Sequence, residues 1–317
     1  MQEESRLPAP SECSTARDAV LVVACSSERE LRTAEERMSI GGGTRLLGLI
    51  GHPVAHSLSP RMHNASFRAE NLDYVYVAMD VAPEDLPAAV KGASVLGFRG
   101  FNLTMPHKRA MLPLLDDADE LAALAGAVNT VVIEDSKLHG YNTDGSGFVE
   151  ACTEAGVALT DRKVLLLGAG GAAASIALAV VRQGAGELLV LNRNLEHARE
   201  LAEKLRAAGG GTKVEACPVD ALGATAPEAE VIVNATPLGM RQDDPLPAPA
   251  GYLGGDKAVC DAVYLPGAET ALIRAARQRG ARVVTGERML LYQGVEAQRL
   301  WTGREPNVKA MSDAISS

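Results

Sequence analysis

Aromatic side chains are scarce in this chain, and their scarcity narrows the range of folds. Phe, Tyr and Trp together make up 3% of the 317 residues. Hydrophobic residues still account for 47% of the sequence, so Ala, Val and Leu must fill the core. Such a core favours helices packed on a sheet over an aromatic-rich all-β design.

Cysteine and histidine are also few, and neither shows a ligand pattern. The five cysteines are scattered and contain no CxxC pair, so neither a disulfide framework nor a zinc site is expected. His52 and His56 are four residues apart, but Pro53 between them disfavours the helix that would place both on one face. We therefore predict no metal site.

Positive charge is in the minority, with 31 Lys and Arg against 40 Asp and Glu and a net charge of −9. A nucleic-acid surface needs clustered cations, so we expect no nucleic-acid partner. Residues 19–25 form the only apolar run before residue 44, and this run is too short to span a bilayer. Its acidic flank also argues against a secretion signal. We expect a cytoplasmic protein without a membrane partner.

Residues 1–43 are rich in Glu, Arg and Ser and end in three glycines. We predict that they form a poorly ordered extension, and we assign them no function. Met38, just before the first strong strand pattern, is an alternative start of the protein.

The remaining chain alternates strand and helix patterns in two successive stretches, which predicts an α/β fold with largely parallel sheets. In the first stretch we expect strands over 45–51, 74–81, 100–104, 128–133 and 138–141, and helices over 60–70 (Ser59 as N-cap), 83–96, 107–115, 116–125 and 145–155. In the second we expect strands over 164–167, 188–191, 231–234, 258–262 and 282–285, and helices ending at 183 and over 195–207, 270–279 and 289–302.

A glycine-rich turn, Gly168-x-Gly170-x-x-Ala173, lies between the first strand and the first helix of the second stretch. This context is typical of a Rossmann-type dinucleotide site. Gly168 permits the tight turn, and Gly170 lets the backbone approach a pyrophosphate at the helix N-terminus. We therefore predict a dinucleotide cofactor.

The end of the next strand bears on which dinucleotide is used. An NAD enzyme usually places Asp or Glu there, whereas this chain has Arg193 between two asparagines. The guanidinium can pair with a 2′-phosphate, which favours NADP. Glu196 and His197 leave NAD open.

Three polar clusters precede the glycine turn and carry the hydroxyl, amide and charged side chains that are the candidates for substrate binding. Two hydroxyls at a helix N-terminus can hold a carboxylate, although a plain N-cap explains them as well. The clusters contain Ser57 and Ser59; Asn102, Thr104 and Lys108; and Asn129 and Asp144.

In this order the clusters resemble the shikimate dehydrogenase family, over about residues 44–315. The pair FNLTMPHK and GYNTDG is specific to that family, whereas GAGGA alone would not be. The matching motifs are HSLSP (56–60), FNLTMPHK (101–108), GAVNT (126–130), GYNTDG (140–145), GAGGA (168–172), NRN (192–194), NATPLGM (234–240), DAVY (261–264) and MLLYQG (289–294).

The resemblance implies an enzyme that interconverts 3-dehydroshikimate and shikimate with NADP(H), with Lys108 and Asp144 as its catalytic pair. The substrate ligands that it implies are Ser57, Ser59, Asn102, Thr104, Asn129, Tyr264 and Gln293. The cofactor-binding residues that it implies are Gly168, Ala169, Gly170, Gly171, Ala172, Asn192, Arg193, Asn194, His197, Ala262 and Gly286.

The predicted architecture is an N-terminal α/β substrate domain with a mostly parallel sheet, followed by a Rossmann-type NADP-binding domain. The catalytic domain would comprise residues 44–145 and 289–317, because Gln293 must return to the substrate, and the Rossmann domain 146–288. The crevice between them would open and close with ligand. A homodimer is a further possibility.

Elementary chemistry agrees with the implied roles. Hydride arriving at a ketone leaves an alkoxide, which needs a proton or a cation, and Lys108 can supply either. Burial would lower the pKa of this lysine, whereas Asp144 would hold it charged, and the sequence leaves open which effect is larger.

Three different functions stay open beside this one. The first is that of the quinate/shikimate dehydrogenase branch, which accepts NAD and which MLLYQG and the following LWTG (300–303) also resemble. His197 stands where many NADP-using members carry a second basic residue, and Arg288 stands where glycine is common near the nicotinamide. The second is a catalytically silent nucleotide-binding paralogue, and the third is a different two-domain Rossmann dehydrogenase.

Overall fold

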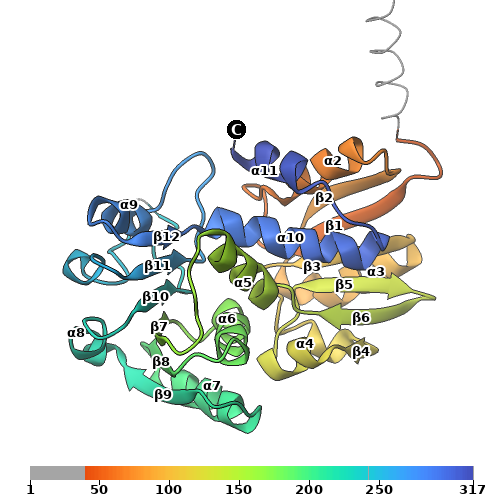
Figure 1. The fold of residues 1–317 in the computed structure, drawn as a ribbon. Coiled ribbons are helices and arrows are strands. Elements are labelled where there is room, and N and C mark those ends of the chain that lie inside the picture. The colour runs from red at the N-terminus through yellow and green to blue at the C-terminus, as the bar shows by residue number, and fades with distance from the viewer. Residues whose placement is uncertain (1–39, 242, 317) are drawn as a thin grey trace, which may run out of the picture. The chain divides into compact units, whose positions relative to one another are not determined.

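The computed structural model describes residues 40–241 and 243–316. The chain from Arg45 onward forms one compact unit that contains two six-stranded sheets (Figure 1). The predicted poor order of residues 1–43 lies almost entirely outside the described residues.

The first sheet has the strand order β2-β1-β3-β5-β6-β4. Strand β1 runs parallel to both of its neighbours, β2 and β3, while β5 is antiparallel to β3 and β6. Interior β1 is buried along most of its length, as expected of a strand covered on both faces. The strand bounds are β1 (Arg45–Gly51), β2 (Tyr74–Asp80), β3 (Phe98–Leu103), β4 (Asp117–Ala118), β5 (Thr130–Glu134) and β6 (Lys137–Tyr141).

The helices of this part are α2 (Ser59–Ala69), α3 (Leu86–Val95) and α4 (Glu120–Ala125). Helix α2 also reaches the outer edge of β2 with one polar side chain. Asn64 Nδ2 donates to the Tyr76 carbonyl at 2.8 Å, and the Tyr76 N–H donates to Asn64 Oδ1 at 2.9 Å. A side-chain amide thus pairs with the backbone groups that the edge strand leaves open at this residue.

The second sheet has the strand order β12-β11-β10-β7-β8-β9, and all its pairs are parallel. In chain order this is the 3-2-1-4-5-6 arrangement of a doubly wound dinucleotide-binding sheet, with the reversal between β7 and β10. The predicted α/β class with a Rossmann-type second part is confirmed. The strands are β7 (Lys163–Leu167), β8 (Glu187–Asn192), β9 (Lys213–Pro218), β10 (Val231–Asn234), β11 (Ala258–Asp261) and β12 (Arg282–Val284).

Helices α6 (Gly171–Arg182), α7 (Leu195–Ala207), α8 (Leu222–Thr225) and α9 (Ala271–Gln278) connect these strands. Small side chains on α6 let it pack closely on the sheet, since its alanines and valines belong to one large buried cluster with β7, β8 and β10. Short 3-10 turns lie at Pro83–Asp85, Leu112–Leu114, Val219–Ala221 and Ala250–Tyr252.

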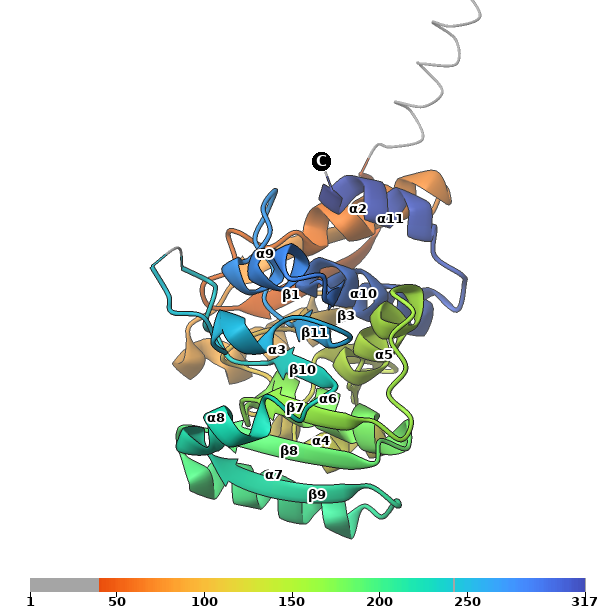
Figure 2. The same cartoon turned by 60° about the vertical axis from the view of Figure 1, so that its left-hand side comes forward.

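Two further helices connect the two parts, α5 (Asp144–Glu154) and α10 (Gly286–Thr302), and α11 (Val308–Ser316) follows α10. Helix α5 packs on α6 and on α10, and α10 in turn contacts β3, β5 and α2 (Figure 1). Figures 1 and 2 both place α11 beside α2, in agreement with their contacts. The Trp301 indole of α10 donates to the Val131 carbonyl at 2.9 Å and so fixes α10 to the first sheet.

Several local predictions were wrong. Residues 107–115 are turns and one 3-10 helix, because Pro113 cannot donate the N–H that a continuous helix would need there. Helix α4 begins only at Glu120, since the Asp119 side chain accepts from the Ala122 N–H and caps it. Ser59 is the first helical residue of α2, and Leu58 occupies the N-cap.

Other differences concern the second part, where helix α8 was also not predicted, and the C-terminus. Helix α10 begins at Gly286, three residues before the predicted start. Strand β9 and helix α11 were not predicted: β9 is polar and ends in Pro218, and α11 is a short helix after an apparently final one. Within the described part of the chain, no helix is long and apolar enough to cross a membrane.

Candidate active site

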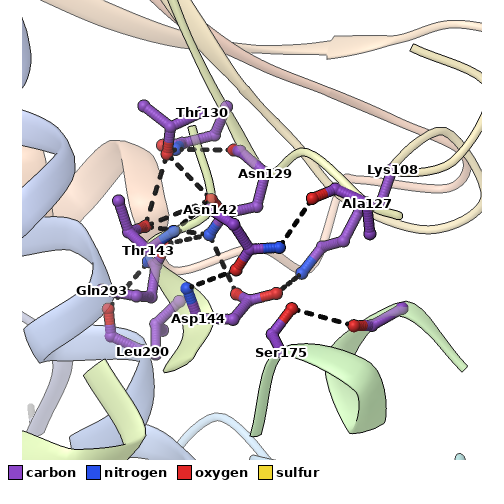
Figure 3. Close-up of polar contacts among 12 residues, drawn as sticks. Lys108, Ala127, Asn129, Thr130, Asn142, Thr143, Asp144, Ser175, Leu290 and Gln293 are labelled. Carbon is purple, nitrogen blue, oxygen red and sulfur yellow. Dashed lines mark hydrogen bonds and ion pairs between the residues drawn. The ribbon is translucent and has the colours of Figure 1, made fainter. Parts of the chain in front are cut away.

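Lys108 and Asp144 form the centre of the candidate site. Lys108 lies in the turn after β3, and Asp144 is the first residue of α5. Lys108 Nζ donates to Asp144 Oδ2 at 2.5 Å (Figure 3). The lysine side chain is 20% exposed and the aspartate side chain 6%, so the pair is shielded but reachable. The N-terminus of α5 favours a carboxylate at this position.

Asn129 orients the aspartate. Its Nδ2 donates to Asp144 Oδ1 at 2.9 Å, and its Oδ1 accepts from the Thr143 N–H at 2.8 Å. Asn142 adds a second link, because its Oδ1 accepts from the Asp144 N–H at 3.2 Å and its Nδ2 donates to the Ala127 carbonyl at 2.7 Å. All these polar groups are buried, so each bond restricts where Asp144 can point.

Gln293 reaches the same network from α10, as Figure 3 shows. Its Oε1 lies 3.3 Å from Asn129 Nδ2, and its Nε2 donates to the Leu290 carbonyl at 2.8 Å. A glycine makes this approach possible: a Cβ on Gly147 of α5 would lie 2.5 Å from the backbone nitrogen of Gln293. The close packing of α5 on α10 therefore places Gln293 beside Asp144.

Asn102 is buried beneath this network with its hydrogen bonds already made. Its Oδ1 accepts from the Tyr76 hydroxyl at 2.7 Å, and its Nδ2 donates to the Asn129 carbonyl at 3.0 Å and to Thr130 Oγ1 at 2.9 Å. In this arrangement Asn102 supports Asn129 and Thr130 from below. Its implied contact with substrate stays a prediction.

The two predicted serines and the predicted tyrosine gather in one place. Ser57 Oγ accepts from the Ser59 N–H at 3.2 Å, and the Ser57 and Tyr264 side chains are hydrogen-bonded to each other. Burial raises the pKa of Tyr264 above its ordinary value, so this group stays a neutral phenol that can donate. Thr104, just after β3, is half-buried and packs its methyl group toward Gly51.

The glycine turn after β7 has the backbone that the motif predicts. Gly168 adopts φ +115°, and a Cβ there would lie 2.8 Å from the Ala235 carbonyl at the end of β10. Nothing lies within 4 Å of a Cβ built on Gly170, and no side chain caps α6. The first N–H groups of α6, from Gly171 and Ala172 onward, can therefore bind a pyrophosphate.

The lysine segment lies directly against this turn. A Cβ built on Gly171 would be 3.7 Å from Lys108 Cβ, and Arg109 Nη2 donates to the Ala169 carbonyl at 3.2 Å. The ammonium and the glycine turn, far apart in sequence, are thus neighbours in space.

The loop after β8 carries Arg193, and no described carboxylate forms an ion pair with it. Asn194 caps α7 by accepting from the Glu196 N–H at 3.0 Å, and Asn192 Nδ2 donates to the Asn194 carbonyl at 2.9 Å. Arg193 and His197 are exposed, and Arg193 forms no ion pair with any described residue. The Glu196 carboxylate instead pairs with Arg199 at 3.3 Å.

The start of α10 packs tightly on the end of β11. A Cβ on Gly286 would lie 2.4 Å from the Val263 carbonyl, so only glycine allows the helix to begin against the Ala262–Val263 backbone. Arg288 points away from the glycine turn: its Nε donates to Glu154 on α5 at 2.6 Å, and its Nη1 donates to Ser312 on α11 at 2.8 Å. Arg288 stands where glycine is common in the family that the sequence resembles. Its side chain links α10 to α5 and α11.

Sequence reasoning did not single out Asn142, Tyr76 or Arg109. Asn142 stands inside GYNTDG and could have been noted from the motif. Tyr76 lies on β2 and acts through Asn102, a relation that only the fold shows. Among the described residues, no group of three or more His, Cys, Asp or Glu side chains could hold a metal ion.

Comparisons with known proteins agree with this geometry. Three family profiles match the chain: the shikimate dehydrogenase substrate binding domain over residues 49–131, shikimate / quinate 5-dehydrogenase over 150–238, and the shikimate 5'-dehydrogenase C-terminal domain over 286–315.

The chain is 58% identical over 278 residues to the shikimate dehydrogenase (NADP(+)) of Rubrobacter xylanophilus, a match that covers 87% of this chain and 97% of that protein. A solved shikimate dehydrogenase in complex with NADP+ superimposes with a TM-score of 0.80 and 40% identity, over 87% of this chain and 96% of the other. The Thermus thermophilus enzyme in complex with NADP(H) and shikimate gives 0.77 and 39%, over 86% and 98%. This chain belongs to the shikimate dehydrogenase family.

Proposed function

We propose that this chain reduces 3-dehydroshikimate reversibly to shikimate with NADPH, the reaction that supplies shikimate to aromatic amino acid biosynthesis. The observation that carries the proposal is the Lys108–Asp144 pair at 2.5 Å, lying against the glycine turn of a doubly wound sheet. NADPH supplies the hydride when bound, and the chain's own residues supply the proton and the positioning.

Lys108 is the proton donor for the ketone oxygen. As the oxygen gains negative charge, the ammonium stabilises it and then transfers a proton, so that the ketone leaves as an alcohol. Asp144 aims the ammonium beforehand, since its Oδ2 accepts the hydrogen bond from Lys108 Nζ. Because the lysine is 20% exposed, solvent can return the proton after each turnover.

The substrate is held by residues on both sides of this pair. Ser57, Ser59 and Tyr264 form a cluster of neutral donors, which suits a carboxylate. Asn129 and Gln293 converge beside Asp144 and suit ring hydroxyls, with Thr104 after β3. Asn102 would hold Asn129 in place. It could contact the substrate only by giving up one of its present hydrogen bonds.

NADP is the preferred cofactor. Arg193 is exposed beside the expected adenosine ribose and has no acid paired with it among the described residues, so its charge can bind a 2′-phosphate. The Rubrobacter relative bears NADP(+) in its name, which also supports this choice over NAD and over the quinate branch.

The division into a catalytic domain (44–145 and 289–317) and a cofactor domain (146–288) is part of the proposal. The two sheets support it, since each is built from one of these segments. The free thiols at Cys152, Cys217 and Cys260 suit a reducing compartment, and we propose the cytoplasm. A homodimer stays a prediction that sedimentation would test.

Initial rates with each of four substrate–cofactor pairs test the proposal: shikimate or quinate, with NADP+ or NAD+. We expect the highest kcat/KM for shikimate with NADP+. A preference for quinate with NAD+ would assign the chain to the other branch, and no activity with any pair would refute the enzyme assignment.

A further inference from the structure

Arg109 is a cation at the cofactor turn that the reaction described above does not use. It follows Lys108 in the turn after β3, and its side chain is exposed. Its Nη2 donates to the Ala169 carbonyl at 3.2 Å, the second residue of the glycine turn. Arg109 thereby reaches from the segment of the first sheet to the turn that opens α6.

Most N–H donors of the Arg109 guanidinium have no partner among the described residues. A guanidinium carries five N–H groups, and among the described residues the Arg109 side chain makes one hydrogen bond, to the Ala169 carbonyl. Among the described residues Arg109 forms no ion pair, unlike Arg162, Arg182 and Arg288, each of which faces a glutamate. Its full positive charge is therefore available to an anion.

The nearest place for an anion is the glycine turn itself. The space above Gly170 is open, α6 begins at Gly171 without a side-chain cap, and Lys108 lines the other side of Gly171. Helix dipole and free N–H groups already favour a pyrophosphate there. A guanidinium anchored at the adjacent carbonyl can add bidentate hydrogen bonds to that pyrophosphate.

We propose that Arg109 is a cofactor-binding residue that contacts the pyrophosphate of NADP(H) from the segment carrying Lys108. The bond to Ala169 holds the side chain at the turn, and the remaining donors bind the phosphate oxygens. One consequence is that cofactor binding and the placement of Lys108 are coupled, since adjacent residues serve both. This inference rests on the dinucleotide site of the proposed function.

Calorimetric titration with three probes tests the assignment. NADP+ carries both a pyrophosphate and a 2′-phosphate, ADP-ribose carries only the pyrophosphate, and adenosine 2′-phosphate carries only the 2′-phosphate. We expect Arg109→Ala to weaken NADP+ and ADP-ribose about tenfold, the size of a charge-assisted hydrogen bond at an exposed site, and to leave adenosine 2′-phosphate unchanged. Arg193→Ala should show the opposite pattern, with ADP-ribose unchanged.

Arg109→Gln separates phosphate binding from support of the turn, because glutamine can still donate to the Ala169 carbonyl but has no charge. We expect it to bind ADP-ribose as weakly as the alanine variant. Arg304→Ala, which removes an exposed arginine just after α10, is the matched control and should bind all three probes like the wild type.

Full recovery in Arg109→Gln, or equal weakening of all three probes in Arg109→Ala, would show that Arg109 acts on the shape of the turn and would overturn the proposal. Unchanged binding in Arg109→Ala would overturn it as well. Failure of the wild type to bind NADP+ or ADP-ribose is a distinct result, since it would refute the dinucleotide site and the proposed function together with this inference.

Discussion

The position of the Lys108 ammonium depends on its hydrogen bond to Asp144. Its ammonium is 2.5 Å from Asp144 Oδ2, and Asp144 is held in turn by Asn129 and by the start of α5. Removing the lysine would therefore remove the proposed proton donor but leave the proposed substrate ligands in place.

We expect Lys108→Ala to lower kcat about 100-fold or more, the range for a positioned acid–base group. Stopped-flow or initial-rate measurement at saturating shikimate and NADP+ would determine it. Lys91→Ala on α3 is the control, because Lys91 is exposed and should leave kcat unaltered. Undiminished turnover in Lys108→Ala would exclude Lys108 from the chemical step.

His63 on α2 is a second residue with a measurable property. It is fully buried, stacks on Tyr76 with ring centroids 4.4 Å apart, and its Nε2 has no hydrogen-bond partner among the described residues. Burial lowers the pKa of His63 from 6.5 to about 4, against a smaller opposing effect of the hydrogen bond with Gln298. The folded protein therefore holds this imidazole neutral.

The sign of the resulting pH dependence follows from proton uptake. Between pH 6.5 and 4 the unfolded chain binds a proton at His63 and the folded chain does not, so the free energy of unfolding falls as the pH falls, by about 3 kcal/mol in all. We expect His63→Phe to lack this part of the decline. Urea unfolding at pH 7, 5.5 and 4 measures it, and parallel curves for both proteins would contradict the assigned pKa.

Among the elements, α5 and α10 are the pair on which the site depends. A Cβ on Gly147 would lie 2.5 Å from the backbone nitrogen of Gln293, so any side chain at position 147 pushes the two helices apart. Asp144 begins one of these helices and Gln293 lies on the other. We therefore expect helix packing and substrate binding to be coupled at this contact.

Gly147→Ala should lower the free energy of unfolding by about 1–3 kcal/mol, as overpacking does, and raise the KM for shikimate. Gly92→Ala on α3 is the matched control: nothing lies within 4 Å of its Cβ, so alanine should stabilise the protein by about 0.5–1 kcal/mol and leave KM unchanged. A Gly147→Ala protein with normal stability and KM would disprove the coupling.

Elements with strong local signals could be predicted from sequence, and others could not. The turn from Gly168 to Ala173 carries its own backbone requirement, so strand, turn and helix followed directly. Strand β9 and helix α11 were not predicted because each is stabilised by a neighbour that is distant in sequence or in pattern. Strand β9 pairs with β8, and α11 packs on α2.

The site shows the same division. Lys108, Asn129 and Asp144 stand in specific motifs and meet in space, although their roles stay predictions. The support that Tyr76 gives to Asn102 joins two strands through a hydrogen bond across the sheet, and no local pattern encodes it. The direction of Arg288 likewise depends on Glu154, which lies far away in the sequence.

At the scale of the whole molecule, the glycine turn follows β7 of the second sheet, whereas Lys108 follows β3 of the first. A ligand that binds only the folded arrangement stabilises it in proportion to the logarithm of its concentration over its Kd. We expect NADP+ at 100 times its Kd to add about 2.7 kcal/mol, which corresponds to roughly 4 °C in the unfolding midpoint, since the entropy of unfolding grows with chain length.

Differential scanning calorimetry with NADP+ and with NAD+ at the same concentration measures this preference. The NAD+ shift should be the smaller, because NAD+ offers no 2′-phosphate to Arg193. Equal shifts with both dinucleotides would show that Arg193 does not select the cofactor.

The Asn64 amide at the rim of the first sheet affects how these molecules meet in concentrated solution. A bare sheet edge is a template on which a foreign strand can add, whereas here the N–H and carbonyl of Tyr76 are already occupied. To pair with Tyr76, an added strand would have to displace the amide and break two hydrogen bonds. The addition of a foreign strand is thereby opposed at this residue of the edge strand.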